Sequence, residues 1–238
     1  MKYQITRHNE VGRAEHGWLQ AKHYFSFASY YNPSKMGFGK LRVINDDVIA
    51  AGTGFGTHPH QDMEIITIPQ QGAVSHKDST GNEGTIRKGE VQVMSAGKGI
   101  RHSEYNHSKD EELSLFQIWI EPNKTGVEPR YDQKVFDYQN NKNKWTELVS
   151  PMDAKDAKGL KIHQNAYIRA THLQAGKSLD YEISGKGNGA YVLISQGEAK
   201  ISNETLISRD AIAIEGTDKF TIKADYDTEM IVIEVPVA

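Results

Sequence analysis

The chain has 238 residues, which is long enough for two β domains of ordinary size or for one large barrel. A hydrophobic fraction of 37% and 21 glycines are typical of a globular, turn-rich protein and not of a disordered one. The net charge is only -3 and the lysines are scattered, so direct binding to nucleic acid is not expected. The absence of cysteine excludes disulfides, Cys-ligated zinc and thiolate nucleophiles.

The N-terminus, residues 1–20, mixes charged and apolar residues and has no apolar stretch of the kind that secretory signals contain. No apolar run in the chain approaches the roughly 20 residues needed to cross a bilayer. We therefore expect a cytoplasmic protein that does not associate with membranes.

Short runs of alternating apolar and polar residues recur along the chain and are rich in β-branched side chains. The clearest are residues 64–68, 90–94, 115–120, 191–194 and 230–235. Gly, Asp and Asn turn residues separate such runs, for example in 79–84, at the spacing of a β-sandwich or small barrel. Helical periodicity is scarce, so the sequence predicts an all-β fold.

The segment from about residue 122 to 151 interrupts the strand pattern with charged and Asn-rich sequence. Such a segment is typical of a domain junction. We place the junction near residue 140, which predicts an N-terminal domain of residues 1–140 and a C-terminal domain of residues 141–238.

Two short motifs indicate a metal site. His58 and His60 are two residues apart, so on a strand both rings project from the same face, and Pro59 between them favours a strand end or an edge. His102 and Glu104 repeat this spacing. One His-x-His pair often occurs by chance, so the prediction depends on the conjunction of both motifs.

Three neutral imidazoles and one carboxylate would suit Fe²⁺, Mn²⁺, Ni²⁺, Cu²⁺ or Zn²⁺. An octahedral ion with four protein ligands keeps two positions open for substrate or dioxygen. His8, His16 and His107 have no such partners in sequence, and we expect them to be solvated.

The glycine, His-x-His and glutamate of residues 52–64 resemble the first motif of cupins, and residues 72–104, which end in GKGIRHSE, look like pirins. The similarity covers most of residues 15–125 and continues more loosely beyond. It implies a bicupin fold of two jelly-roll-like β-barrels, with His58, His60, His102 and Glu104 holding one divalent metal in the N-terminal barrel. The metal expected first is Fe²⁺, with Zn²⁺, Ni²⁺, Mn²⁺, Cu²⁺ or Co²⁺ as alternatives.

The sequence departs from the general cupin pattern in two places. Ser95 stands where cupins usually carry proline, and the stretch from Glu64 to Gly72 is one residue longer. Cupins commonly use the glutamate at the position of Glu64 as a ligand, whereas pirins use the one at Glu104. We therefore expect Glu104 to be a metal ligand with a catalytic role, and Glu64 to be a general base or an orienting group.

The C-terminal half contains only His163 and His172, which are nine residues apart and form no His-x-His pair. We expect this second barrel to be free of metal. Its expected contribution is to close one side of the active-site cleft or to stabilise the first barrel by packing.

The resemblance implies a function, because pirin relatives act as quercetin 2,3-dioxygenases. The expected substrates are a flavonol and dioxygen. Two alternatives stay open: a metal-dependent, redox-sensing regulator of transcription that acts through protein partners, and a different cupin reaction such as isomerisation or decarboxylation. The sequence contains no partner motif that would separate them.

Overall fold

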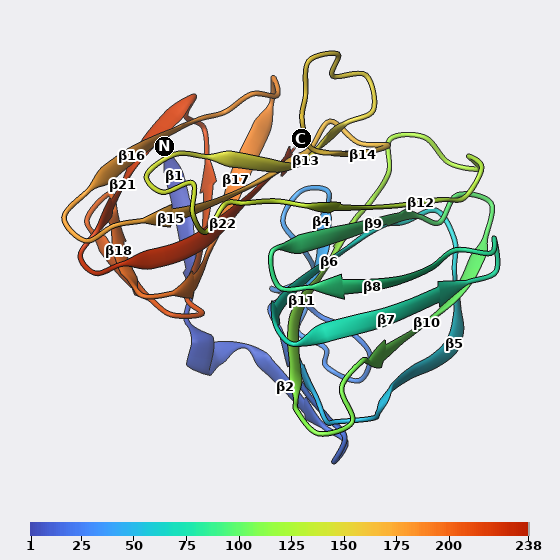
Figure 1. Cartoon of the computed structure of the whole chain (residues 1–238). Coiled ribbons are helices and arrows are strands. Elements are labelled where there is room, and N and C mark those ends of the chain that lie inside the picture. Colours follow the sequence, from blue (N-terminus) through green and yellow to red (C-terminus); the bar gives the residue numbers. More distant parts are fainter. Residues whose placement is uncertain (238) are drawn as a thin grey trace.

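The computed structural model describes residues 1–237, which form strands and turns almost throughout (Figure 1). Within this range the one helical element is the three-residue 3-10 turn η1 (His8–Glu10). No helix of the described residues is long and apolar enough to cross a membrane. The predicted all-β class is therefore confirmed.

The N-terminal barrel consists of a seven-stranded and a four-stranded sheet. The larger sheet, in the order β12-β9-β6-β11-β4-β3-β2, contains β2 (Gly12–Glu15), β3 (Leu19–His23), β4 (Leu41–Ile49), β6 (Glu64–Gln71), β9 (Glu90–Ser95), β11 (Leu113–Ile120) and β12 (Arg130–Val135). The smaller sheet, in the order β5-β10-β7-β8, contains β5 (Gly54–His60), β7 (Ala73–Asp78), β8 (Glu83–Arg87) and β10 (Ile100–Asn106).

The C-terminal barrel repeats this arrangement of seven strands and four. Its larger sheet, in the order β1-β20-β17-β22-β15-β13-β14, contains β1 (Lys2–Thr6), β13 (Thr146–Pro151), β14 (Leu160–Ile162), β15 (Tyr167–Leu173), β17 (Asn188–Gln196), β20 (Ala211–Glu215) and β22 (Thr228–Pro236). Its smaller sheet, in the order β16-β21-β18-β19, contains β16 (Ser178–Glu182), β18 (Glu198–Ile201), β19 (Glu204–Ile207) and β21 (Lys219–Ala224).

The first strand of the chain belongs to the second barrel. β1 pairs antiparallel with β20, so that Tyr3 lies opposite Ile214, and in Figure 1 the blue strand stands among the orange and red ones. The chain then enters the N-terminal barrel through η1 and β2. The boundary between residues 140 and 141 stays a prediction. Wherever that boundary lies, the pairing of β1 with β20 gives the two barrels a second covalent connection.

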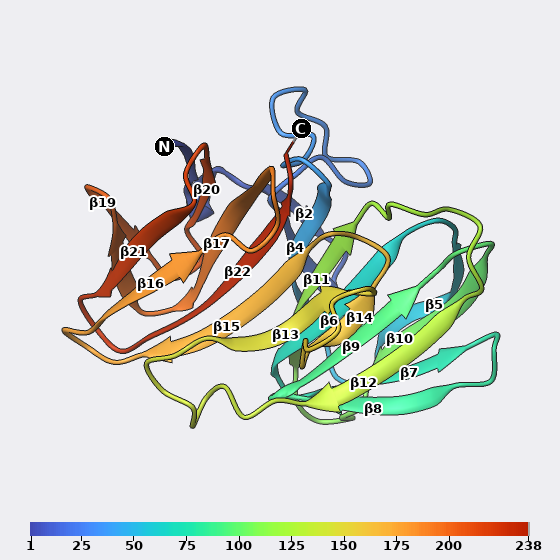
Figure 2. The same cartoon turned by 90° about the horizontal axis from the view of Figure 1, so that it is seen from above.

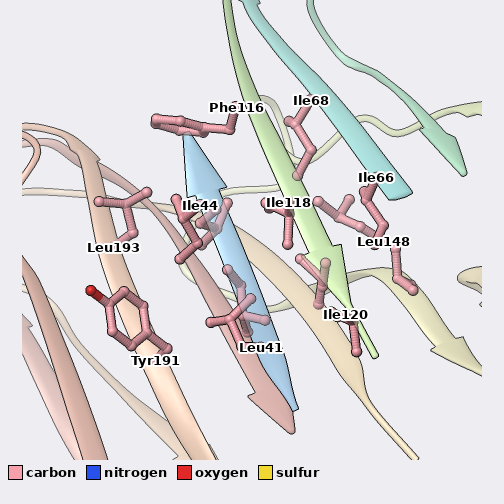
Figure 3. Packing of buried hydrophobic residues seen from close by; sticks show 14 of the residues in the cluster. Leu41, Ile44, Ile66, Ile68, Phe116, Ile118, Ile120, Leu148, Tyr191 and Leu193 are labelled. Carbon is pink, nitrogen blue, oxygen red and sulfur yellow. The ribbon is translucent and has the colours of Figure 1, made fainter. Parts of the chain in front are cut away.

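The two barrels lie side by side and share an apolar core (Figure 2). Side chains of β4, β6 and β11, such as Ile44, Ile66 and Phe116, pack in one cluster with Leu148 and Tyr191 from the C-terminal barrel (Figure 3). Because β6 has one face in this shared core and the other inside its barrel, residues 64–69 are all buried. Burial on both faces also explains why the isoleucines at 65, 66 and 68 do not follow the alternation of a half-exposed strand.

The interiors of the two barrels differ. A single apolar cluster, which includes Tyr181, Val192 and Ile222, fills the C-terminal barrel. The N-terminal barrel contains two smaller clusters, one around Ile86 and Leu115 and one around Ile65 and Met94. Its interior also contains buried polar side chains, namely Asp47, Thr67, His76, Gln92, His102 and Glu104. The chemistry of the protein is therefore expected in the N-terminal barrel.

Candidate metal centre

The structure brings His58, His60 and His102 together. His102 of β10 lies directly opposite His58 in the antiparallel pairing with β5, and His60 follows two residues further on the same strand face. One ring nitrogen of each histidine lies within 4.8 Å of the other two. The ring centroids are 4.5–4.9 Å apart.

The three imidazoles have lone pairs available for a cation. His58 donates its Nδ1–H to the carbonyl oxygen of Gly56 at 2.7 Å, which leaves Nε2 unprotonated in the neutral ring. His102 is 1% exposed, and neither of its ring nitrogens has a partner among residues 1–237. Burial, together with the neighbouring histidines, lowers the pKa of His60 to about 4 and that of His102 to about 3. Both rings are therefore neutral at pH 7, as metal ligation requires.

Glu104 is held by three neutral side chains from the larger sheet. Its Oε1 accepts hydrogen bonds from Thr67 Oγ1 at 3.0 Å and Gln92 Nε2 at 2.9 Å, and its Oε2 accepts one from Gln117 Nε2 at 2.7 Å. An oxygen of the carboxylate lies within 4.8 Å of ring nitrogens of His102 and His76. It is not part of the group that His58, His60 and His102 form under the same 4.8 Å limit. Glu104 is thus fixed beside His102, with one lone pair of Oε2 left for a cation.

His76 is a buried member of the site that the sequence argument missed. It lies opposite Glu104 in the pairing of β7 with β10, and its ring stacks on Tyr131 with the centroids 4.4 Å apart. His76 Nε2 lies 3.2 Å from Asp78 Oδ2. Burial alone would raise the pKa of Asp78, but hydrogen bonds from Thr80, His76 and Asn82 lower it to about 2. Asp78 is therefore ionised and fixes the ring of His76 through Nε2.

A cavity of about 170 Å³ opens beside the three histidines. It is lined by Phe27, Asn45, Asp47, Phe55, His58, His60, Ile65, His102, Glu104, Gln117 and Trp119. Trp119 makes edge-to-face contacts with His60 at 4.9 Å and with Phe27 at 5.3 Å between ring centroids. Aromatic side chains combined with convergent polar groups are typical of a site for a small organic ligand.

Residues 4–120 match the family model described as pirin, and residues 148–235 match the model of the quercetinase C-terminal cupin domain. The solved structure of the bacterial pirin YhhW from Escherichia coli in complex with nickel(II) is 42% identical, has a TM-score of 0.93 and is covered in full, as is this chain. The chain belongs to the pirin family.

Curated relatives cover nearly the whole length of this pirin. Quercetin 2,3-dioxygenase of Escherichia coli K12 is 44% identical over 98% of each chain. A pirin-like protein of Caulobacter vibrioides is 43% identical over 95% of this chain and 96% of its own. The predicted bicupin fold of two β-barrels is thereby confirmed.

Glu64 does not lie with the three histidines in this pirin, and its expected role as a general base or an orienting group stays a prediction. The backbone turns at Asp62, where φ is 46°, and β6 then enters the other sheet. Ile65 lines the cavity, so Glu64 points to the opposite face of β6. There its Oε2 accepts a hydrogen bond from Ser95 Oγ at 2.7 Å. Ser95, which stands where cupins usually carry proline, thus hydrogen-bonds Glu64.

The position of Glu64 predicts a pH-dependent stability. Burial raises the pKa of Glu64 to about 7, against hydrogen bonds from Ser95 and the backbone of His163 that lower it. Because the folded-state pKa exceeds the unfolded one, this residue makes folding less favourable as the pH rises from about 4.5 to 7. We expect Glu64→Gln to remove that loss, which amounts to roughly 3 kcal/mol at most.

Urea denaturation of both proteins at pH 5 and pH 8 measures this effect. The free energy of unfolding of Glu64→Gln minus that of wild type should be larger at pH 8 than at pH 5. An equal pH dependence in both proteins would contradict the assignment.

Proposed function

We propose that this pirin is a metal-dependent dioxygenase that opens the heterocyclic ring of flavonols such as quercetin. The observation that carries the proposal is the group of His58, His60 and the buried His102, which has two unpartnered ring nitrogens, at the wall of a cavity with aromatic side chains. The activity named for the Escherichia coli relative at 44% identity supports the same reaction.

The residues present fit a divalent transition metal. The proposed ligands are His58, His60, His102 and Glu104, a nitrogen-rich set with one anionic oxygen that suits Fe²⁺, Ni²⁺, Zn²⁺, Mn²⁺, Cu²⁺ or Co²⁺. The structure of the related Escherichia coli pirin was solved in complex with nickel(II), which supports binding of a divalent ion. When bound, such an ion supplies a Lewis acid for an enol or phenol oxygen and access to dioxygen chemistry.

The side chains of the site set its charge and the shape of its wall. Because the imidazoles are neutral and Glu104 carries one negative charge, the loaded site has a net charge of about +1, which favours an anionic oxygen such as that of a flavonolate. Phe27, Phe55 and Trp119 give the planar rings of a flavonol an apolar wall. The hydrogen bonds from Thr67, Gln92 and Gln117 keep Glu104 in place without neutralising it.

Oxygen uptake with quercetin is the test. Protein stripped by a chelator is expected to be inactive, and the same protein reloaded with Fe²⁺ or Ni²⁺ should consume oxygen and quercetin in equal amounts. His16→Gln is a suitable control, because His16 is exposed and lies outside the group of three histidines. Equal rates with and without chelator would contradict the metal-centred reaction.

The alternatives give different results in the same assay. Turnover that continues without oxygen would indicate an isomerase or a decarboxylase. No turnover with any of the six metals would favour a redox-sensing regulator that binds protein partners.

A further inference from the structure

His102 has two buried ring nitrogens, of which a metal uses one. A neutral imidazole carries one lone pair and one N–H, so a ligating ring keeps an N–H that needs an acceptor. For His58 that acceptor is the carbonyl oxygen of Gly56 at 2.7 Å. His102 is 1% exposed, and neither of its nitrogens is hydrogen-bonded within residues 1–237. A buried N–H without an acceptor is unfavourable, so the ligand role of His102 requires one nearby.

His76 lies beside His102 on the neighbouring strand. In the pairing of β7 with β10, Asp78 is opposite His102 and His76 is opposite Glu104. A ring nitrogen of His76 lies within 4.8 Å of one of His102, and the two ring centroids are 5.3 Å apart. His76 is 2% exposed, and its Nδ1 is buried with no hydrogen-bond partner in the part of the chain that the structure describes. Two buried imidazoles with unsatisfied nitrogens are thus neighbours.

Asp78 determines which nitrogen of His76 carries the proton. Its Oδ1 accepts hydrogen bonds from the backbone N–H and the hydroxyl of Thr80 and from the backbone N–H of Asn82, at 2.8, 2.7 and 3.1 Å. Its Oδ2 accepts one from Asn82 Nδ2 at 3.1 Å and lies 3.2 Å from His76 Nε2. Because this carboxylate acts as an acceptor throughout, Nε2 carries the proton and Nδ1 keeps a lone pair. Stacking on Tyr131, with the ring planes 20° from parallel, also holds the His76 ring.

The carboxylate of Glu104 is the other acceptor in this group of three side chains. It already receives three hydrogen bonds and is the proposed oxygen ligand of the metal. It cannot satisfy the lone pair of His76, because both groups accept. Within the group of His76, His102 and Glu104, the N–H of His102 is therefore the donor that His76 Nδ1 can accept.

We propose that His76 is a positioning residue for the metal: its Nδ1 accepts the N–H of His102, directly or through one bound water, and so turns the lone pair of His102 toward the ion. Asp78 in turn holds the tautomer of His76. A partner that hydrogen-bonds the second nitrogen of a ligating histidine fixes its orientation and raises its basicity. Ordered water bridges polar groups that are too far apart for a direct hydrogen bond. The inference rests on the proposed function through the metal ligand His102 and makes no use of the substrate.

Calorimetric titration with nickel(II) tests the inference without turnover. His76→Leu should bind nickel at least about tenfold more weakly than wild type, because the N–H of His102 loses its acceptor. His76→Gln should recover part of that affinity, because its side-chain oxygen can accept the same hydrogen bond. Asp78→Asn should also bind more weakly, since an amide that donates to Nε2 moves the proton of His76 to Nδ1, against the N–H of His102. His107→Gln is the matched control, because His107 is exposed and belongs to neither group of potential ligands.

Nitrogen NMR of isotope-labelled, zinc-loaded protein separates this role from a purely structural one. Zinc is diamagnetic, so the spectra report which ring nitrogens are protonated and which bind the ion. In wild-type protein we expect His102 to bind zinc through one nitrogen and to be protonated on the other, with His76 protonated on Nε2 alone. In Asp78→Asn the proton of His76 should move to Nδ1. The wild-type spectra need no variant, so a variant that fails to fold leaves this test in place.

Three results would overturn the inference. They are wild-type nickel affinity in folded His76→Leu or Asp78→Asn, no recovery of affinity in His76→Gln, and a zinc-bound nitrogen on His76 in the spectra. Failure of the proposed function is distinguishable from these. Wild-type protein that binds no nickel would remove the metal centre itself, whereas nickel binding without oxygen uptake on quercetin would contradict the reaction alone.

Discussion

His102→Ala is expected to lower the affinity for nickel(II) by more than about 100-fold and to abolish oxygen uptake with quercetin. Loss of an outer-shell partner alone typically lowers metal affinity 10–100-fold, and His102 is placed as a direct ligand. It is also the residue that both groups of potential ligands share. Calorimetric titration with nickel and elemental analysis of the purified variant measure the loss.

The fold should survive this substitution. His102 makes no side-chain hydrogen bond to residues 1–237, so its truncation leaves no buried partner unsatisfied. A circular-dichroism spectrum like that of wild type checks this point, and His16→Ala serves as the matched histidine control. Retention of full nickel affinity in a folded His102→Ala protein would contradict the proposal that His102 is a metal ligand.

The second large effect is expected from Glu104→Gln, which should lower metal occupancy at least about tenfold. In the unsubstituted protein the amide of Gln117 donates to Glu104 Oε2 at 2.7 Å. The substitution removes the negative charge and can place a second amide donor against that of Gln117. Glu64→Gln is the matched control, because it makes the same chemical change at another buried glutamate on the far face of β6. This control should keep its metal and, unlike Glu104→Gln, most of its activity.

Elemental analysis of the two purified variants decides between them. Loss of metal in Glu64→Gln with retention in Glu104→Gln would reverse the assignment. Retention in both would leave the three histidines without a carboxylate from either position.

The strands and the grouping of side chains within each of the two histidine motifs could be predicted from sequence, because both depend on local spacing. Alternation of side chains on a strand places His58 with His60, and His102 with Glu104, whatever the rest of the fold. The resemblance to pirins then supplied the pairing of two strands that are more than forty residues apart. The predicted class and bicupin fold therefore agree with the structure.

The sequence was less informative where the outcome depended on strand pairing and not on spacing. Spacing alone allowed Glu64 to share the face of His60, but the turn at Asp62 moves it to another sheet. His76 and Asp78 repeat the i, i+2 spacing of the other two motifs, and this signal was overlooked.

Two further features depend on contacts that a single sequence does not reveal. β1 joins the distant β20, and this pairing connects opposite ends of the chain. Asp46 and Asp47 are adjacent in sequence, but Asp46 pairs with Arg209 whereas Asp47 lines the cavity.

The position of the metal in crystals of nickel-loaded protein, located by anomalous diffraction, tests the central claim most directly. We predict one strong peak in the N-terminal barrel at about 2.1 Å from ring nitrogens of His58, His60 and His102 and from an oxygen of Glu104. A peak held instead by His76, His102 and Glu104, or no peak in the N-terminal barrel, would contradict the account.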